Sequence, residues 1–421
     1  MTEPLAKPAR KNPLRRSQQI NLPPGSRGRV ALGLTAAAAE GRFALQVCAD
    51  CTAVLYPPRE NCPHCLGDRL SWREQTGKGR LIASTSLQHS NDLYFRERLP
   101  WRLGLVQLDA GPTLMVHLHG DLSEGANLPV RVTARLDRSG QAVLIALPEM
   151  EGENMSDDKM LREMASDPRQ RKVLVTDGMS SLGQALVRQM VDAGAELIWV
   201  GHARPWTRHG SGLDGISALP QVALIDLDLS NERSVARWGA EIGGKVDILI
   251  NNDELHRSHG IAARRGSGVA RAEMDINYFG LLRLAQAFGP ALRARAADGV
   301  AHACAWVNLL SIYALCNFPP QGTFSASKAA ALSLSQCLRA EMQGSGIRVL
   351  NVFPGPLDDE WNQNLPPPKL APDVLAAAIL RALRDGVEDI YPGEVAQDWL
   401  ARWRESPKVL ERELAMMGVG S

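Results

Sequence analysis

Hydrophobic and polar positions follow two different patterns along the chain. Residues 42–148 contain short runs in which apolar and polar residues alternate, such as RLIASTSL, LGLVQLD, TLMVHLHG and PVRVTARL. This period of two predicts the strands of an antiparallel sheet or small barrel. From Arg171 onward, apolar runs such as KVLVTDG, AELIWVG and KVDILINN are followed by alanine-rich segments. Strands that alternate with helices predict a doubly wound, parallel α/β sheet of the Rossmann type.

A charged stretch without strand character separates the two patterns, MEGENMSDDKMLREMASDPRQ at 150–170. We therefore predict a basic disordered arm at 1–34, a β domain at 35–148, a linker at 149–170 that has room for one short helix, and an α/β domain at 171–421. The arm lacks the apolar segment of a secretory signal. Its cationic residues are Lys7, Arg10, Lys11, Arg15, Arg16, Arg27 and Arg29.

Overall charge and apolar content narrow the function classes. Lys and Arg number 47 against 46 Asp and Glu, a formal net charge of +1, which argues against wholesale nucleic-acid binding. No run approaches the roughly 18 apolar residues of a membrane span, so we predict none. Seven cysteines, an odd number with one tight cluster, are typical of a reducing cytoplasm and a metal site rather than a disulfide framework. We expect a cytoplasmic protein.

The cysteine cluster is the most specific chemical motif. CADC and CPHC give two CxxC pairs, and four thiolates in a tetrahedron suit Zn²⁺. A complete ligand set leaves no open position for a substrate, so the zinc should be structural. The alternative, four unrelated reduced thiols, does not explain the paired spacing. The predicted ligands are Cys48, Cys51, Cys62 and Cys65.

The segment around this cluster resembles a known family. FALQVCADCTAVLYPPRENCPHC, followed by SWREQTGKGRLIASTSLQH and LGLVQLDAGPTLMVHL, is similar to the rubredoxin-like zinc ribbon plus OB-fold proteins that accompany thiolases and other acyl-CoA enzymes. The resemblance covers residues 35–148 and implies a non-catalytic protein that docks on a thiolase-like subunit and helps form its acyl-CoA site. A ribbon with a barrel also suits nucleic-acid binding, but the strands carry few aromatics, mainly Tyr94, Phe95 and Trp101, and no basic stripe. We therefore predict no nucleic-acid partner.

Residues 171 to 400 resemble the short-chain dehydrogenase/reductase family. In that family the first strand ends in Thr-Gly-x-x-x-Gly-x-Gly, whose glycines let the backbone close on a pyrophosphate at a helix N-terminus. The stretch TDGMSSLG keeps Thr176 and Gly183, has Gly178 offset by one, and places Asp177 and Ser181 where the other two glycines belong. A side chain there narrows the phosphate approach, and an aspartate repels a diphosphate.

Other cofactor positions are also partly kept. Asp228 matches the adenine-side aspartate of the family, and Asn251 and Asn252 remain from its Asn-Asn-Ala-Gly. Arg204, just past the second strand, favours a 2′-phosphate, and hence NADP over NAD if any dinucleotide binds. Four acidic residues lie along the expected path of the anion: Asp177, Asp253, Glu254 and Asp359.

The catalytic positions are similarly incomplete. Asn277 and Ser311 match the asparagine and serine of the family, and Lys328 matches its lysine. Phe324 stands where the tyrosine belongs, on the same helix face as Lys328. A phenyl ring has no proton to donate, and losing a general acid typically costs about 10²- to 10⁴-fold in rate. The alternative acid is Tyr313, in a different loop. We interpret Asn277, Ser311 and Lys328 as remnants.

A degenerate site on an intact fold predicts that the C-terminal domain serves association. The small-residue helix at 325–343 is a candidate interface, in a homo-oligomer or with an active sister dehydrogenase. The fusion predicts a non-catalytic accessory or assembly subunit of an acyl-CoA-processing, thiolase or β-oxidation-like complex. The alternative is a weak NADPH-dependent oxidoreductase acting on a 3-hydroxyacyl- or 3-ketoacyl-CoA.

Overall fold

The computed structural model describes residues 2–8, 20–25, 27–203, 211–257, 260–262, 265–297 and 302–418. These form two compact units, one made mainly of Gln19–Ser166 and the other mainly of Asp167–Leu383 and Glu388–Ser421. No described helix is both long and apolar enough to cross a lipid bilayer.

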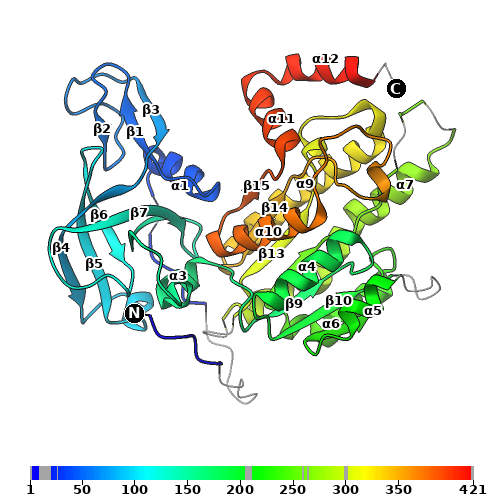
Figure 1. Cartoon of the computed structure of the whole chain (residues 1–421), viewed down its shortest axis with the longest axis horizontal. Coiled ribbons are helices and arrows are strands. Elements are labelled where there is room, and N and C mark those ends of the chain that lie inside the picture. The colour runs from blue at the N-terminus through cyan, green and yellow to red at the C-terminus, as the bar shows by residue number, and fades with distance from the viewer. Residues whose placement is uncertain are drawn as a thin grey trace. The chain divides into compact units, whose positions relative to one another are not determined.

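The N-terminal unit contains a small sheet and a closed barrel (Figure 1). The sheet has the antiparallel order β2-β1-β3, and the barrel closes in the order β4-β5-β6-β8-β7. The elements are α1 (Leu32–Ala39), β1 (Ala44–Cys48), β2 (Val54–Leu55), β3 (Leu70–Glu74), β4 (Lys78–Leu87), α2 (Leu93–Arg96), β5 (Trp101–Leu108), β6 (Thr113–Leu118), β7 (Leu128–Leu136), β8 (Ala142–Pro148), η2 (Met155–Asp157) and α3 (Lys159–Met164).

Alternation along the strands fills the barrel as predicted. Leu81, Val106 and Leu114 are fully buried, and Val106 is paired with Leu81 on one side and with Leu114 on the other. Leu105 and Met115, each next in sequence to one of these, point outward and are exposed. The period-two pattern therefore identified the core face of β5 and β6.

The structure differs from the predicted arm at its carboxyl end. Residues Arg29–Ala31 form a 3₁₀ turn that leads into α1, and Leu34 on α1 is 0% exposed within the barrel core. In the sequence, the arginines of the arm indicate a polar, unpacked segment. In the structure, Leu34, Ala37 and Ala38 form one buried face of α1. Residues 9–19 of the arm lie outside the described residues.

The linker prediction also changes in one respect. Its single short helix is α3, which is not a free spacer, because Met164 is buried against Ile145 and Leu147 on the outer wall of the barrel. The segment up to Ser166 therefore packs as part of the N-terminal unit.

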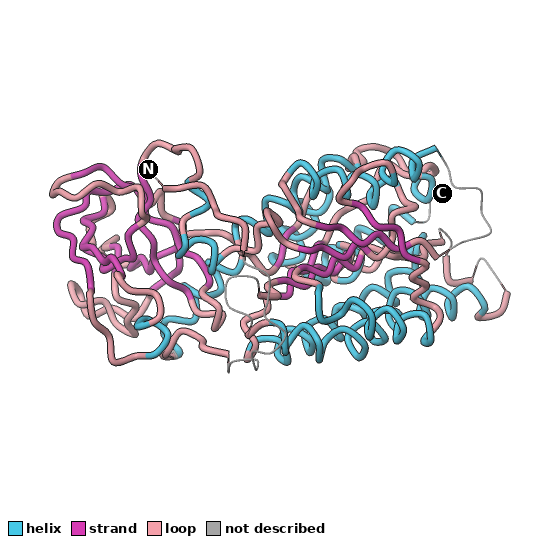
Figure 2. The backbone as a smooth tube through the Cα atoms, turned by 90° about the horizontal axis from the view of Figure 1, so that it is seen from below, coloured by secondary structure: helices cyan, strands magenta, loops and turns pink. Residues whose placement is uncertain are grey.

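The C-terminal unit is the predicted doubly wound sheet. Seven parallel strands run in the order β11-β10-β9-β12-β13-β14-β15, with helices on both sides (Figure 2). The strands are β9 (Lys172–Val175), β10 (Leu197–Gly201), β11 (Val222–Ile225), β12 (Ile248–Asn251), β13 (Ala305–Leu309), β14 (Arg348–Val352) and β15 (Asp389–Ile390).

Helices and short turns connect these strands. They are α4 (Ser181–Asp192), α5 (Ser211–Ser217), α6 (Glu232–Ile242), η3 (Gly243–Lys245), α7 (Gly268–Met274), the π-helical turn η4 (Asp275–Gly280), α8 (Leu281–Arg295), η6 (Ile312–Ala314), η7 (Pro319–Gln321), α9 (Gly322–Gln343), η8 (Glu360–Asn362), α10 (Pro372–Asp385), α11 (Glu394–Glu405) and α12 (Pro407–Gly418). The strand order reverses beside β9, where β10 and β12 lie on either side of it. In such sheets this reversal, at the carboxyl ends of the strands, is where ligands bind.

Candidate functional site

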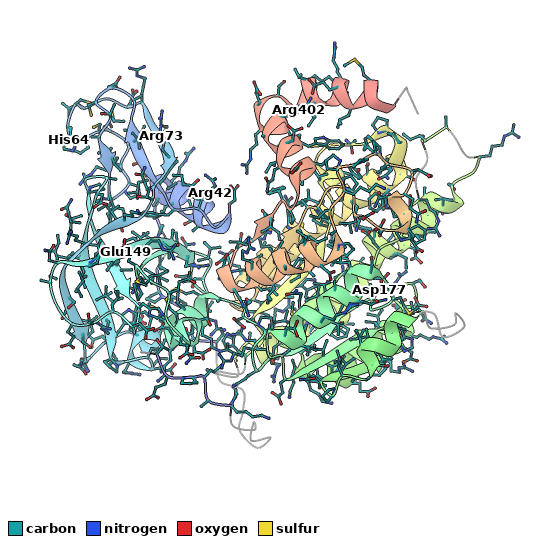
Figure 3. The ribbon with its side chains drawn as sticks, in the orientation of Figure 1. Arg42, His64, Arg73, Glu149, Asp177 and Arg402 are labelled. Carbon is teal, nitrogen blue, oxygen red and sulfur yellow. The ribbon has the colours of Figure 1, made fainter. Side chains whose placement is uncertain are left out.

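The four predicted zinc ligands meet at one point in the ribbon. Their Sγ atoms all lie within 4.8 Å of one another, with Cys48 3.5 Å from Cys65 and Cys51 3.5 Å from Cys62. Four thiols at this spacing fit a closed tetrahedral Zn²⁺ site. His64, inside the second pair, is exposed (Figure 3) and stays outside the ligand set.

Local backbone geometry explains why the cysteines converge. In each pair, the amide of the residue four after the first cysteine donates back to the carbonyl of that cysteine: Thr52 to Cys48 at 3.0 Å and Leu66 to Cys62 at 2.8 Å. Thr52 and Leu66 both have left-handed backbones, with φ of 60° and 62°. The two knuckles therefore have the same local shape, and each points its two sulfurs at the same centre.

The glycine-poor turn after β9 is closed by its own side chain. One carboxylate oxygen of Asp177 accepts the amide of Met179 at 2.8 Å, and the other accepts the amide of Ser180 at 3.2 Å. The hydroxyl of Ser180 accepts the amide of Gly183 at 3.1 Å and caps α4. In a dinucleotide-binding turn, amides of this kind face the phosphates. Here an internal carboxylate and a hydroxyl already hold three of them.

The retained residues of the turn tie strands and helix together. A side chain at Gly183 would collide with the carbonyl of Asp177, and one at Gly178 would collide with Val200 on β10. The hydroxyl of Thr176 accepts the amides of Asn252, at 3.0 Å, and Asp253, at 3.1 Å. Asn252 returns a hydrogen bond of 2.7 Å from its side-chain nitrogen to the carbonyl of Asp177. Each of the four residues predicted to bind a cofactor here therefore also helps to hold the fold together. They are Thr176, Gly178, Gly183 and Asn252.

Two predicted cofactor residues remain, Arg204 and Asp228. Arg204 lies outside the described residues. Asp228 accepts from the amide and hydroxyl of Ser230, at 2.9 and 2.7 Å, and so closes its own turn. Burial and the nearby carboxyls of Asp177, Asp228 and Glu254 raise the pKa of Asp253 to about 8. This end of the sheet thus crowds carboxyl groups together, which opposes the approach of a further anion.

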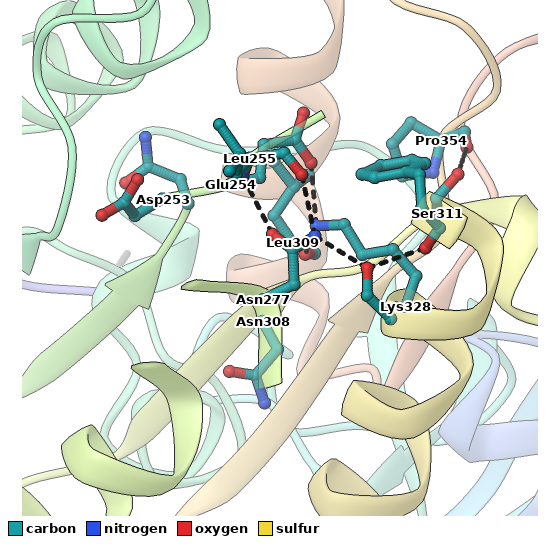
Figure 4. Close-up of polar contacts among 12 residues, drawn as sticks. Asp253, Glu254, Leu255, Asn277, Asn308, Leu309, Ser311, Lys328 and Pro354 are labelled. Atoms are coloured by element: carbon teal, nitrogen blue, oxygen red, sulfur yellow. Dashed lines mark hydrogen bonds and ion pairs between the residues drawn. The ribbon is translucent and has the colours of Figure 1, made fainter. Parts of the chain in front are cut away.

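The sequence correctly predicted that Phe324 and Lys328 share a face of α9. Phe324 is 3% exposed, and the Lys328 ammonium lies 5.4 Å from the centre of its ring. The same ammonium forms an ion pair of 2.8 Å with Glu254 and donates to the carbonyl of Leu309 at 2.9 Å (Figure 4). The lysine side chain is 2% exposed. Its charge is therefore balanced inside the protein by a residue in the Asn-Asn-Asp-Glu segment.

Asn277 and Ser311 also bond to their surroundings. Asn277, in the π-helical turn, exchanges two 2.9 Å hydrogen bonds with the backbone of Leu255 and donates to Ser327 at 2.8 Å. Ser311 accepts the amide of Tyr313 at 3.2 Å and donates to the carbonyl of Pro354 at 3.4 Å. Both residues therefore have hydrogen-bond partners within the protein.

The two other residues considered for this site are also fixed locally. Tyr313, the alternative acid, is buried in an aromatic cluster and stacks on Phe318, with ring centres 5.2 Å apart. Its burial raises the pKa of the phenol. Asp359 caps η8 by accepting the amides of Trp361 and Asn362, both at 3.1 Å. Burial, and then the nearby Glu254, raise the pKa of Asp359 to about 6.

A histidine that sequence reasoning did not single out occupies the centre of this region. His256 stacks on Phe324 with ring centres 4.0 Å apart, and its buried Nε2 has no hydrogen-bond partner in the described part of the chain. Burial lowers its pKa, so the ring is neutral. His256 matches no motif position of the family. Its only signal in the sequence is its place two residues after the acidic pair Asp253 and Glu254.

Little open space remains around these side chains. The cavity between His256, Phe324, Ser311 and Tyr313 measures about 20 Å³, which is room for about one water molecule.

Comparison with known proteins agrees with this division. The short chain dehydrogenase family matches residues 171–369 of this chain. The family of the rubredoxin-like zinc ribbon domain of ChsH2 matches residues 35–71, and that of the C-terminal OB-fold domain of ChsH2 matches residues 72–135. A crystal structure of a short chain dehydrogenase from Burkholderia cenocepacia J2315, in complex with NADP, is 33% identical with a TM-score of 0.52; the similarity covers 58% of this chain and 97% of that one.

Curated relatives match the same region. "Dehydrogenase/reductase SDR family member 7C" of Bos taurus is 31% identical over 43% of this chain and 58% of its own length. Farnesol dehydrogenase of Aedes aegypti is 28% identical over 44% of this chain and 76% of its own length. The chain spans under three fifths of the length of the first of these relatives. By its C-terminal unit the chain belongs to the short-chain dehydrogenase family, joined to a zinc ribbon and OB-fold of the ChsH2 type.

Proposed function

We propose that the protein is a non-catalytic accessory or assembly subunit of an acyl-CoA-processing complex of the thiolase or β-oxidation-like kind. The ribbon and OB-fold unit would dock on a thiolase-like subunit and contribute to its acyl-CoA site. The dehydrogenase-like unit would serve association rather than hydride transfer. Joining the two in one chain would hold the partner subunits, and with them their successive activities, at high effective concentration.

The observation that carries this proposal is the pairing on α9. Reduction of a carbonyl needs a proton donor beside the developing alkoxide, and Phe324 has none. Lys328, which would lower the pKa of a tyrosine at that position, is held by Glu254 at 2.8 Å instead. The carboxylate of Asp177 in the turn after β9 also opposes dinucleotide binding, because it holds two amides that the phosphates would need.

A weak NADPH-dependent oxidoreductase acting on a 3-hydroxyacyl- or 3-ketoacyl-CoA is the second candidate. Asn277, Ser311 and Lys328 are still present, the first of them in a π-helical turn, a feature frequent at functional sites. The similar Burkholderia protein was crystallised with NADP. If this activity exists, the neutral His256 is the group nearest to the missing phenol that can carry a proton.

Cofactor titration separates the two candidates. We expect the full chain to show no saturable NADPH binding by calorimetry at millimolar cofactor, and no oxidation of NADPH with a 3-ketoacyl-CoA. A matched variant, Asp177→Gly with Ser181→Gly, restores the glycine turn and should bind NADPH more tightly than the parent. Micromolar NADPH binding with turnover by the unaltered chain would refute the assembly role and favour the oxidoreductase.

The association surface can be tested separately. Four of the exposed residues of α9 are small: Ala326, Ser333, Cys337 and Ala340. Such residues permit close helix approach, so we expect light scattering after size exclusion to give an oligomer, alone or with a co-expressed thiolase-like or dehydrogenase subunit. Ser333→Arg should dissociate it, whereas Arg188→Ser, on α4, should not. A strict monomer under all of these conditions contradicts the proposal.

A further inference from the structure

A second pocket lies within the N-terminal unit, apart from both sites described above. It has a volume of about 310 Å³, within the range of small-molecule sites. Its lining comes from the outer wall of the barrel, from α2 and α3, and from Pro23, Pro24, Gly25 and Arg27 of the N-terminal arm. The arm is anchored there by hydrogen bonds from Ser139 to the carbonyl of Pro23, at 2.9 Å, and from Asn21 to Glu97, at 3.0 Å.

Aromatic rings form one wall of this pocket. Trp101 packs edge-to-face against Phe95 and His117, with ring centres 5.3 Å apart in both cases. Tyr94 lies edge-on to Phe95 at 5.2 Å and is fixed by a 2.7 Å hydrogen bond to Glu163. A rigid wall of ring edges and faces suits a flat, apolar ligand body.

The polar groups of the pocket are arranged to hold an anion. The indole of Trp101, which can only donate, bonds to Nδ1 of His117 at 2.9 Å. The imidazole is therefore the tautomer with its proton on Nε2, and no hydrogen bond from that nitrogen to any described residue is found. Burial, with a contribution from nearby Arg27, lowers the pKa of His117 to about 4, so the ring is a neutral donor at physiological pH. Arg27 adds a guanidinium to the same lining.

Two further polar residues line the pocket, Asp137 and Gln141. Asp137 is the acidic member of the lining; one of its oxygens accepts the amides of Ser139 and Gln141, at 2.8 and 3.0 Å, which offsets part of its charge. The side-chain oxygen of Gln141 is buried and has no hydrogen-bond partner in the described part of the chain. A buried acceptor without a donor is costly unless a ligand or water supplies one.

We propose that this pocket binds a small aromatic carboxylate, with its ring against Trp101 and Phe95, its carboxylate between Arg27 and His117, and a hydroxyl or amine directed to Gln141. A dry cavity of about 150 Å³ holds one benzene molecule. The pocket is about twice that size, so it fits a fused two-ring acid. The inference is independent of the proposed function, because it uses neither the zinc site nor the dehydrogenase-like unit.

The test is a calorimetric titration of the full-length protein with 6-hydroxy-2-naphthoate. For a ligand of this size we expect a dissociation constant on the order of 10⁻⁴ M. The uncharged 6-hydroxy-2-naphthamide should bind about tenfold more weakly, because it lacks the carboxylate. Arg27→Gln should weaken the acid by a similar factor, and Gln141→Leu should remove the preference for the hydroxyl over unsubstituted 2-naphthoate.

Arg29→Gln is the matched control, since Arg29 lies on the same arm, is exposed and is absent from the pocket lining. Its affinity for the acid should equal that of the parent. The proposal is overturned if the acid shows no saturable binding at millimolar concentration, if the amide binds as tightly as the acid, or if Arg27→Gln behaves like Arg29→Gln. None of these results depends on whether the chain binds NADPH or a thiolase-like partner.

Discussion

Asp253 makes the stability of the C-terminal unit depend on pH, in a direction that can be worked out. Its pKa rises from 3.8 to about 8, first by burial and then by the carboxyls of Asp177, Asp228 and Glu254. In the folded protein the group stays protonated up to about pH 8, whereas in the unfolded chain it ionises near pH 4. Unfolding therefore releases a proton between these values, and the free energy of unfolding falls as pH rises from about 4 to 8 and then levels off.

The size of the effect follows from the same shift. About four pKa units at 1.36 kcal/mol each set an upper limit of roughly 5–6 kcal/mol. Because the neighbouring carboxyls share the repulsion and the site can relax, we expect Asp253→Asn to recover about half of this, roughly 2–3 kcal/mol, at about pH 9. At about pH 5 the gain should shrink to under about 1 kcal/mol, because the folded aspartate is neutral there and pH 5 lies only about one unit above the pKa of the unfolded chain.

Urea denaturation followed by tryptophan fluorescence measures this stability. Of the nine tryptophans, only Trp72 and Trp101 precede residue 171, so the signal comes mainly from the C-terminal unit. Asp192→Asn removes an exposed carboxylate from the same unit and should change stability by no more than about 0.5 kcal/mol at either pH. The reasoning fails if Asp253→Asn is no more stabilising at the higher pH than at the lower, or if Asp192→Asn reproduces its effect.

Three further perturbations test the two sites. Phe324→Tyr alone should give no NADPH-dependent turnover of a 3-ketoacyl-CoA, followed by NADPH absorbance, because the glycine turn and the acidic residues remain; robust turnover would mean that the site is almost intact. Lys328→Met should cost about 3–5 kcal/mol in urea denaturation at neutral pH, since it leaves Glu254 without its partner, while Lys408→Met, exposed on α12, should be nearly neutral. Cys48→Ser should abolish zinc binding, measured by metal analysis, and lower the melting temperature of the N-terminal unit only; an unchanged metal content would exclude this ligand set.

Local patterns in the sequence were enough to predict much of the architecture. The paired CxxC spacing predicts the zinc cluster because each pair builds its own knuckle through short-range hydrogen bonds, as at Cys48 and Cys62. The four-residue spacing of Phe324 and Lys328 likewise fixes them on one helix face. Alternation of period two and the strand–helix rhythm give the barrel and the parallel sheet, because both depend on which face of an element is buried.

What the sequence could not supply were contacts between distant segments. The Lys328 ammonium meets Glu254 only because the loop after β12 and the helix α9 reach the same edge of the sheet. The stacking of His256 on Phe324 depends on the same long-range packing. Asp177 was expected to repel a diphosphate, but not to bond to the amides of its own turn. Leu34 was assigned to a disordered arm because nearby arginines outweighed a short apolar stretch.

The closed turn after β9 has a consequence for how the protein is maintained in a cell. An enzyme that binds a dinucleotide is stabilised by it in proportion to the logarithm of the free cofactor concentration. Its folded fraction therefore changes with the concentration of that cofactor in the cell. In the proposed assembly subunit the carboxylate of Asp177 holds the amides of Met179 and Ser180 itself, and it is always present because it is covalently attached. The folded C-terminal unit should therefore persist unchanged when nicotinamide pools rise or collapse, a property suited to a permanent scaffold.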